Sequence, residues 1–74
     1  MNDHILMNNL KVLRAKHDIS QEELAEKVGV TRVTINNIEN NKWVPSTVLA
    51  LRIARIFQVS LEEVFWLTED KSGL

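Results

Sequence analysis

A single glycine, Gly29, interrupts a run that otherwise has the pattern of helices, and it limits the fold more than any other residue. The run, SQEELAEKVGVTRVTINNIEN, covers residues 20–40. Glycine adopts the left-handed backbone conformation freely, whereas another residue loses about 1 kcal/mol there, so Gly29 can end one helix and turn the chain. Apolar residues lie at helical intervals before and after it. The pattern therefore predicts two short helices that pack across a tight turn.

Serine and threonine residues mark where helices start. Ser20 with Glu23 and Ser60 with Glu63 each form an S-x-x-E capping box, in which serine oxygen and glutamate carboxylate accept each other's backbone N–H. The other candidate caps are Thr31, Ser46 and, for the first helix, Asn8 or Asn9. We expect an all-α fold with helices near residues 9–17, 21–28, 32–39, 47–57 and 61–66.

The 74 residues make one small domain, 1–74, of ordinary globular composition, with 45% hydrophobic and 26% charged residues. We place its body at residues 9–66. No apolar run is long enough to span a membrane, and the N-terminus lacks a signal-peptide pattern, so we expect a cytoplasmic protein without membrane association. The net charge of −1 hides a gradient: residues 1–55 carry eight basic and six acidic side chains, whereas residues 56–74 carry one and four. Net charge therefore does not exclude a polyanionic partner.

The helix after Gly29 leaves a set of side chains on its outer face. With Ile35 and Ile38 turned inward, the outward residues are Thr31, Arg32, Val33, Asn36 and Asn37. Arginine can bond guanine through two N–H groups, asparagine can bond adenine with the same two-point geometry, and an apolar group can contact the thymine methyl. This outer face therefore suits double-stranded DNA.

The motif resembles the helix-turn-helix of the phage repressor and Cro class, the XRE family of transcriptional regulators, in its short single-domain bacterial type. The residues that carry the resemblance are Gln21, Ala25, Gly29-Val30, Ile35 and Ile38. It covers about residues 9–65, with LKVLRAKHDISQ before the motif and IENNKWVPS and LALRIARIFQVSLEEVF after it. The resemblance implies a five-helix lambda-repressor-like DNA-binding domain whose second motif helix enters the major groove.

The resemblance also implies roles for individual residues. Side chains expected to contact bases are Arg32, Val33, Asn36 and Asn37, and those expected to contact phosphates are Gln21, Thr31, Thr34, Asn40 and Lys42. Arg14 and Glu39 stand where the family has an ion pair between the first and third helices, so we assign both a structural role.

Two departures from the family pattern affect these expectations. Asn41 replaces a glycine that many relatives carry, but asparagine tolerates the left-handed conformation and can also end a helix. Arg32 and Val33 replace the glutamines that the best-studied phage repressors carry at the start of this helix. The DNA sequence that is recognised must therefore differ.

The C-terminal segment holds more large apolar residues than so small a domain can readily cover. They are Leu61, Val64, Phe65, Trp66 and Leu67. We expect them to form a homodimer interface, which would set two recognition helices about 34–36 Å apart on one face of the duplex. The alternative is that Phe65 belongs to the core and Trp66 half covers it. Residues 5–7 either pair with residues 66–69 in a short two-stranded sheet beside this interface or extend the first helix.

Two functions fit these patterns. The first is a sequence-specific transcriptional regulator, a repressor rather than an activator, that acts as a homodimer on a palindromic or pseudopalindromic operator. The second is an antitoxin or other protein-interaction module on the same fold, whose C-terminal apolar segment holds a protein partner. We expect no enzyme, no cofactor and no metal site, since His4 and His17 stand alone without cysteine or a glycine-rich phosphate loop.

Overall fold

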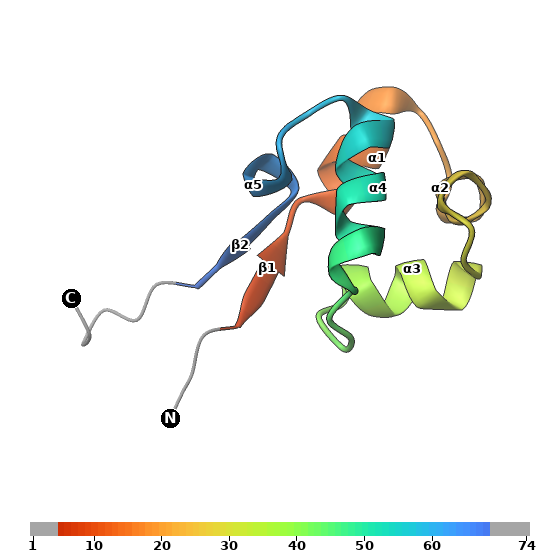
Figure 1. Cartoon of the computed structure of the whole chain (residues 1–74). Helices are drawn as coiled ribbons and strands as arrows, with labels where there is room; N and C mark the ends of the chain where they lie inside the picture. The colour runs from red at the N-terminus through yellow and green to blue at the C-terminus, as the bar shows by residue number, and fades with distance from the viewer. Residues whose placement is uncertain (1–4, 69–74) are drawn as a thin grey trace.

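The computed structural model describes residues 5–68, which form five α-helices and a two-stranded antiparallel sheet (Figure 1). In chain order the elements are β1 (Leu6–Asn8), α1 (Leu10–His17), α2 (Gln21–Val28), α3 (Arg32–Glu39), α4 (Thr47–Phe57), α5 (Leu61–Val64) and β2 (Phe65–Leu67). The expected fold class, five helices with a small sheet made by the two ends of the chain, is confirmed. No helix within these residues is long and apolar enough to cross a membrane.

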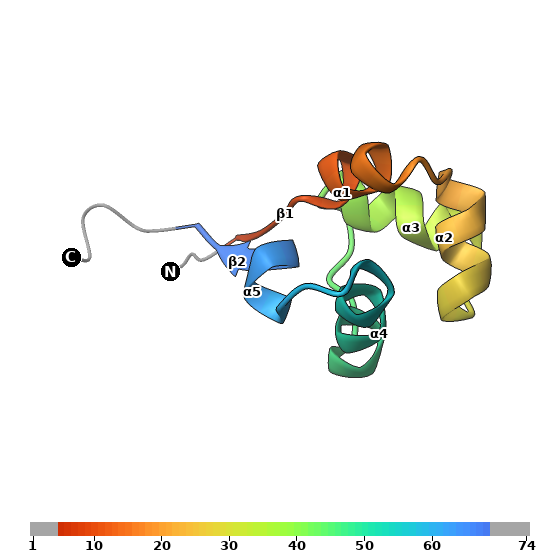
Figure 2. The same ribbon diagram turned by 90° about the horizontal axis from the view of Figure 1, so that it is seen from above.

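The sheet and α2 lie at opposite ends of the molecule, with α4 between them (Figures 1 and 2). In Figure 1, α2 is seen end-on, and α3 begins below it and runs crosswise to it toward the foot of α4, where the loop after α3 lies. This arrangement leaves one long side of α3 on the outside of the molecule.

Side-chain caps explain the helix starts. Ser20 Oγ accepts the Glu23 N–H at 3.0 Å and Glu23 Oε1 accepts the Ser20 N–H at 2.9 Å, which completes the expected capping box. The second box, at the start of α5, is also present, and Thr31 and Ser46 cap α3 and α4 as expected. Helix α1 starts at Leu10, and Asn8 rather than Asn9 supplies a side-chain bond, because Asn8 Oδ1 accepts the Leu10 N–H at 3.1 Å.

The core is one continuous apolar cluster to which all five helices and β2 contribute. Its most deeply buried side chains are Leu10, Leu24, Ile35, Ile38, Ile53 and Val64. Burial of one such side chain contributes about 1.5–3 kcal/mol to stability, so this cluster sets the position of α2 and α3 against α4. His17 ends α1 as expected, and its ring meets Phe57 edge-on with the ring centroids 5.1 Å apart.

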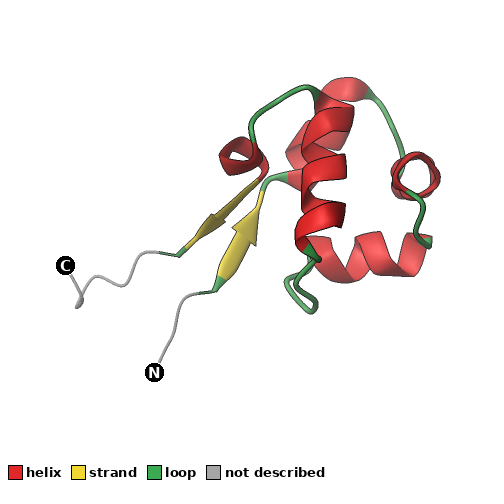
Figure 3. Cartoon of the chain, in the orientation of Figure 1, coloured by secondary structure: helices red, strands yellow, loops and turns green. Residues whose placement is uncertain are grey.

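The C-terminal segment differs from the expectation in two details. Helix α5 ends at Val64 rather than at residue 66, because Phe65 has an extended backbone that turns its side chain into the core. The sheet pairs Leu6 with Leu67, Met7 with Trp66 and Asn8 with Phe65, so residues 6–8, not 5–7, form the first strand. Figure 3 shows the two strands side by side. Residue 69, expected to end the second strand, lies outside the described residues.

Candidate nucleic-acid interface

The turn between α2 and α3 is built on Gly29. Its φ of 82° lies in the left-handed region, and both its N–H and that of Val30 donate to the carbonyl of Ala25, at 2.8 and 3.0 Å. Ala25 itself is only 2% exposed, and its small side chain lets α3 pass close to α2. The chain then enters α3 at Thr31, whose Oγ1 accepts the Thr34 N–H at 3.2 Å. The turn therefore holds α2 and α3 in one fixed arrangement.

Helix α3 buries one side and exposes the other. Ile35, Ile38 and Glu39 are buried, whereas Thr31, Arg32 and Val33 are exposed at its N-terminal end. Asn36 and Asn37 are half-buried and lie further along the helix. Val33 exposes 57% of its surface although it is apolar, so its side chain is accessible to an external apolar group.

A polar network beneath this face joins α1, α2 and α3 around the buried carboxylate of Glu39. Arg14 Nε donates to Glu39 Oε2 at 2.6 Å and Arg14 Nη2 to Glu39 Oε1 at 3.2 Å, so the expected ion pair is present. Gln21 Nε2 donates to Glu39 Oε1 at 3.0 Å and to Asn36 Oδ1 at 3.2 Å. The Gln21 side chain, at the N-terminus of α2, is therefore held in place by α3.

Arg32 lies next to this network. Its Nη1 is 3.4 Å from Gln21 Oε1, a long hydrogen bond at the surface. Arginine offers five N–H donors, so one weak bond to Gln21 leaves most of the guanidinium for an external acceptor. Arg32, a candidate base contact, and Gln21, a candidate phosphate contact, therefore lie side by side across the α2–α3 turn.

The end of α3 carries the remaining polar candidates. Asn40 Nδ2 donates to the Asn36 carbonyl at 2.9 Å and to Asn36 Oδ1 at 3.2 Å, so Asn40 is tied back to its own helix. Lys42 is exposed in the loop that follows. Within residues 5–68, the side chains of Asn37 and Lys42 have no hydrogen-bond partner, which leaves both for an external ligand.

The expected DNA-contacting residues thus gather on one continuous face made by the start of α2, the exposed side of α3 and the loop after it. Sequence patterns did not predict the hydrogen bonds from Gln21 to Asn36 and to Glu39, because these partners lie 15 and 18 residues away in the sequence. No three histidine, aspartate or glutamate side chains among the described residues gather closely enough to hold a metal ion.

The family model described as helix-turn-helix matches residues 10–64. The chain belongs to the helix-turn-helix family. Its relatives include the HTH-type transcriptional regulator YgzD of Bacillus subtilis, 49% identical over 65 residues that cover 88% of this chain and 98% of YgzD. An HTH-type transcriptional regulator of Methanocaldococcus jannaschii is 46% identical over 66 residues, which cover 89% of this chain and all of that protein.

A solved structure supports the same assignment for the fold. The restriction-modification controller protein C.AhdI of Aeromonas hydrophila superposes with a TM-score of 0.68 at 30% identity, over 73% of this chain and 78% of C.AhdI. The helix-turn-helix assignment makes this chain a transcriptional regulator of the DNA-binding class, as the resemblance in the sequence predicted. This family is not a class of enzymes.

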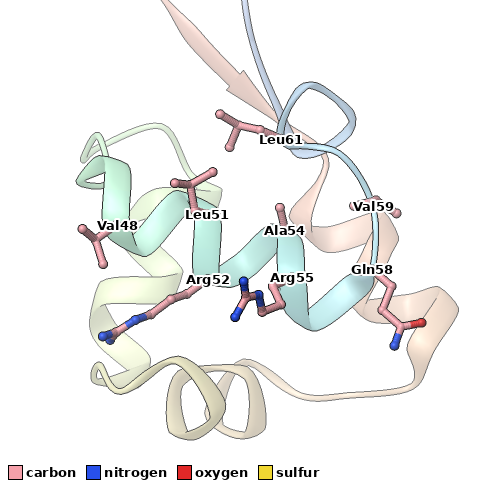
Figure 4. A pocket seen from close by; sticks show the side chains of 8 residues that line it. All are labelled: Val48, Leu51, Arg52, Ala54, Arg55, Gln58, Val59 and Leu61. Carbon is pink, nitrogen blue, oxygen red and sulfur yellow. The ribbon is translucent and has the colours of Figure 1, made fainter.

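A second surface lies on α4, α5 and the sheet. A hollow of about 620 Å³ beside α4 is lined by side chains that include Val48, Leu51 and Leu61 (Figure 4). A second hollow, of about 440 Å³, is lined by Leu6, Leu61, Trp66 and Leu67 among others, so Leu61 borders both. We call the exposed and half-buried apolar side chains along these two hollows the apolar face; they are Leu6, Val48, Leu51, Leu61, Trp66 and Leu67. Arg52 and Arg55 also line the first hollow.

The apolar face overlaps the expected dimer interface only in part. Leu61 is half-buried, and Trp66 and Leu67 expose 42% and 55% of their surfaces. Val64 and Phe65 are instead buried in the core of the single chain, the alternative considered for Phe65. Sequence patterns missed Val48 and Leu51, exposed at 60% and 51%, although their spacing of three residues on one helix was the available signal.

Proposed function

We propose that this regulator is a repressor that binds a two-fold symmetric operator as a homodimer. The observation that carries the proposal is the ordered polar face of α2 and α3, on which Gln21, held by Glu39, lies beside the exposed Arg32. Side chains that are already fixed lose less entropy on binding DNA.

Two sets of residues contact the DNA in this proposal. Gln21, Thr31, Thr34, Asn40 and Lys42 bind phosphates and set the register of α3 in the major groove. Arg32, Val33, Asn36 and Asn37 contact base edges, with the arginine on guanine O6 and N7. A bound dimer excludes other proteins from the same duplex, so operator binding by itself suffices for repression.

The apolar face supports the homodimer. It places Val48, Leu51, Trp66 and Leu67 in water, although each is a residue type that interiors and interface cores favour. A two-fold axis through this face would bury it against the same face of a second chain and leave both α3 helices free. Symmetry of the protein then implies symmetry of the operator.

Selection of binding sites from a random duplex library, with the purified full-length chain at near-physiological salt, tests this proposal. We expect enrichment of a two-fold symmetric sequence whose half-sites are about one helical turn apart. Selection of an asymmetric single site would contradict the homodimer, and recovery of no sequence would contradict sequence-specific regulation. A parallel selection with Arg32→Ala should lose preference at one position of each half-site.

A second candidate function has one observation in its favour. Antitoxin HipB of Escherichia coli is 34% identical over 56 residues, which cover 76% of this chain and 60% of HipB. In this alternative the chain is an antitoxin, and the apolar face holds a toxin instead of a second copy. A purified chain that remains monomeric and forms a stable complex with the product of a neighbouring gene would favour this function.

A further inference from the structure

Asn8, the last residue of β1, uses both ends of its side-chain amide. Its Nδ2 donates to the Ile38 carbonyl at 3.0 Å and to Asn41 Oδ1 at 3.1 Å. Its Oδ1 accepts the Leu10 N–H at 3.1 Å. One side chain therefore joins the sheet, the start of α1 and the end of α3, over 30 and 33 residues of sequence.

We propose that Asn8 is a positioning residue for DNA binding, which holds the loop of residues 40–44 in the place from which it meets a phosphate. The proposal rests on the proposed function, because it assumes that Lys42 in this loop contacts DNA. Asn8 itself does not touch the duplex; it acts through Asn41 and the end of α3.

The loop needs such a tie because packing holds it weakly. Trp43 and Val44 expose 48% and 66% of their surfaces. A hollow of about 150 Å³ separates the loop from β1 and is lined by residues of both. Among the described residues, the hydrogen bonds between β1 and residues 38–44 are the two that Asn8 donates, to Ile38 and to Asn41. Without these two bonds, the backbone bonds that end α3 still hold the start of the loop, but the loop is no longer tied to β1 across the hollow.

The backbone of the loop explains why Asn41 matters. Asn41 has a left-handed φ of 61°. Its N–H donates to the Ile38 carbonyl at 3.1 Å, and the Lys42 N–H donates to the Asn37 carbonyl at 2.8 Å. These two bonds form a Schellman motif at the end of α3. Glycine fits this conformation better than asparagine. Glycine, however, has no side chain to accept the bond from Asn8. Asparagine at position 41 therefore fits the backbone less well than glycine but provides the hydrogen bond to the sheet.

The link also joins the two functional surfaces. Leu6 lies two residues before Asn8 in β1 and lines the apolar face with Trp66 and Leu67. A second chain that covers this face would contact β1, and Asn8 joins β1 to the loop beside α3. The Asn8 side chain thus connects the proposed dimer interface to the loop proposed to contact a phosphate.

Two neutral substitutions break the link from opposite ends. Asn8→Ser keeps an oxygen that can accept the Leu10 N–H but cannot reach Ile38 and Asn41. Asn41→Gly removes the acceptor and suits the left-handed backbone. Neither changes the charge of the DNA-binding face. Thr68→Val is the matched control: Thr68 Oγ1 bonds both the N–H and the carbonyl of Ile5, so its loss loosens the same sheet at its other end.

Hydrogen exchange of the free proteins is measured first, followed by affinity for the selected operator over a range of salt concentrations. In both variants we expect faster exchange of the Lys42 N–H, DNA affinity lower by about three- to tenfold, and a salt slope smaller by about one. The double variant should lose no more affinity than either single variant, because both remove one link. Thr68→Val should leave all three measurements unchanged.

Unchanged Lys42 exchange or unchanged operator affinity in Asn41→Gly would overturn the proposal, as would equal losses in Thr68→Val. Asn41→Gly keeps the test decisive even if Asn8→Ser fails to fold. A wild-type chain that binds no duplex would refute the proposed function instead, while the exchange measurement would still show whether Asn8 orders the loop.

Discussion

Gln21 Nε2 donates a 3.0 Å hydrogen bond to Glu39 Oε1, the carboxylate that also receives the guanidinium of Arg14. The bond joins the first residue of α2 to the last residue of α3 and so fixes the two motif helices at the ends that face away from Gly29. A side chain assigned to phosphate contact is thereby also a structural member of the motif.

Arg14→Ala should destabilise the fold by about 3 kcal/mol, because the Glu39 side chain is fully buried and would lose its cation. Urea denaturation measures the change. Arg14→Lys is the control, since it keeps the charge but loses the two-point bond, and it should cost less. A normally stable Arg14→Ala protein with weak DNA binding would show that Arg14 contacts DNA.

Gln21→Ala should weaken binding to all duplexes by a similar factor, because a lost phosphate contact carries no sequence information. The same change should cost about 1 kcal/mol of stability, since Glu39 loses one of its donors. Binding assays on operator and random duplex, with thermal unfolding alongside, separate the two effects. Glu22→Ala, an exposed neighbour on α2, is the control, and a selective loss at the operator would contradict the phosphate role.

Arg32→Ala should lose about 1–3 kcal/mol of discrimination at one base pair in each half-site. Arg32 is exposed and its 3.4 Å contact with Gln21 is long, so stability should change little. Competition binding with operators substituted one base pair at a time measures the effect. A loss that is equal on every duplex would assign Arg32 to phosphate instead.

Leu51→Asp should dissociate the proposed homodimer, because the dimer would bury the new carboxylate within the apolar face, and we expect a dimer Kd raised at least about a hundredfold. Leu51 is 51% exposed, so the folded single chain should tolerate the change. Sedimentation velocity over a range of protein concentrations distinguishes single chains from dimers and so measures this Kd. Val12→Asp is the matched control, since Val12 is 48% exposed on α1, outside the apolar face. Trp66→Ala should also weaken the dimer, and dimers of unchanged Kd would refute this interface.

Gly29→Ala should destabilise the fold by about 1 kcal/mol through backbone strain alone, because φ is 82° and an added Cβ would lie 3.8 Å from Arg52 Nη1, an ordinary contact. Thermal unfolding measures the loss. Gln58→Gly is the reverse experiment, since Gln58 ends α4 with a φ of 57°, and it should raise stability. A loss well above about 3 kcal/mol in Gly29→Ala would mean that the added methyl group does meet an obstacle.

Local signals in the sequence predicted most of the helices. The bounds of α2, α3 and α4 agree with the expectation because Ser20, Thr31 and Ser46 each bond a backbone N–H three residues away. Gly29 likewise predicted the turn, because its left-handed conformation is a local property of glycine and depends on no distant residue. The period of the helix after that turn predicted which side of α3 is exposed, and the proposed DNA contacts lie on that side.

The sequence by itself therefore determined the helices, the turn and the outward face of α3, all of which depend on bonds within about five residues. Only the tertiary structure decided that Phe65 leaves the helix for β2, that Asn8 bonds Asn41, and that Val48 and Leu51 lie beside Leu61. Each of these relationships joins positions that come together only after the core has formed, and no local pattern specifies which distant groups will meet.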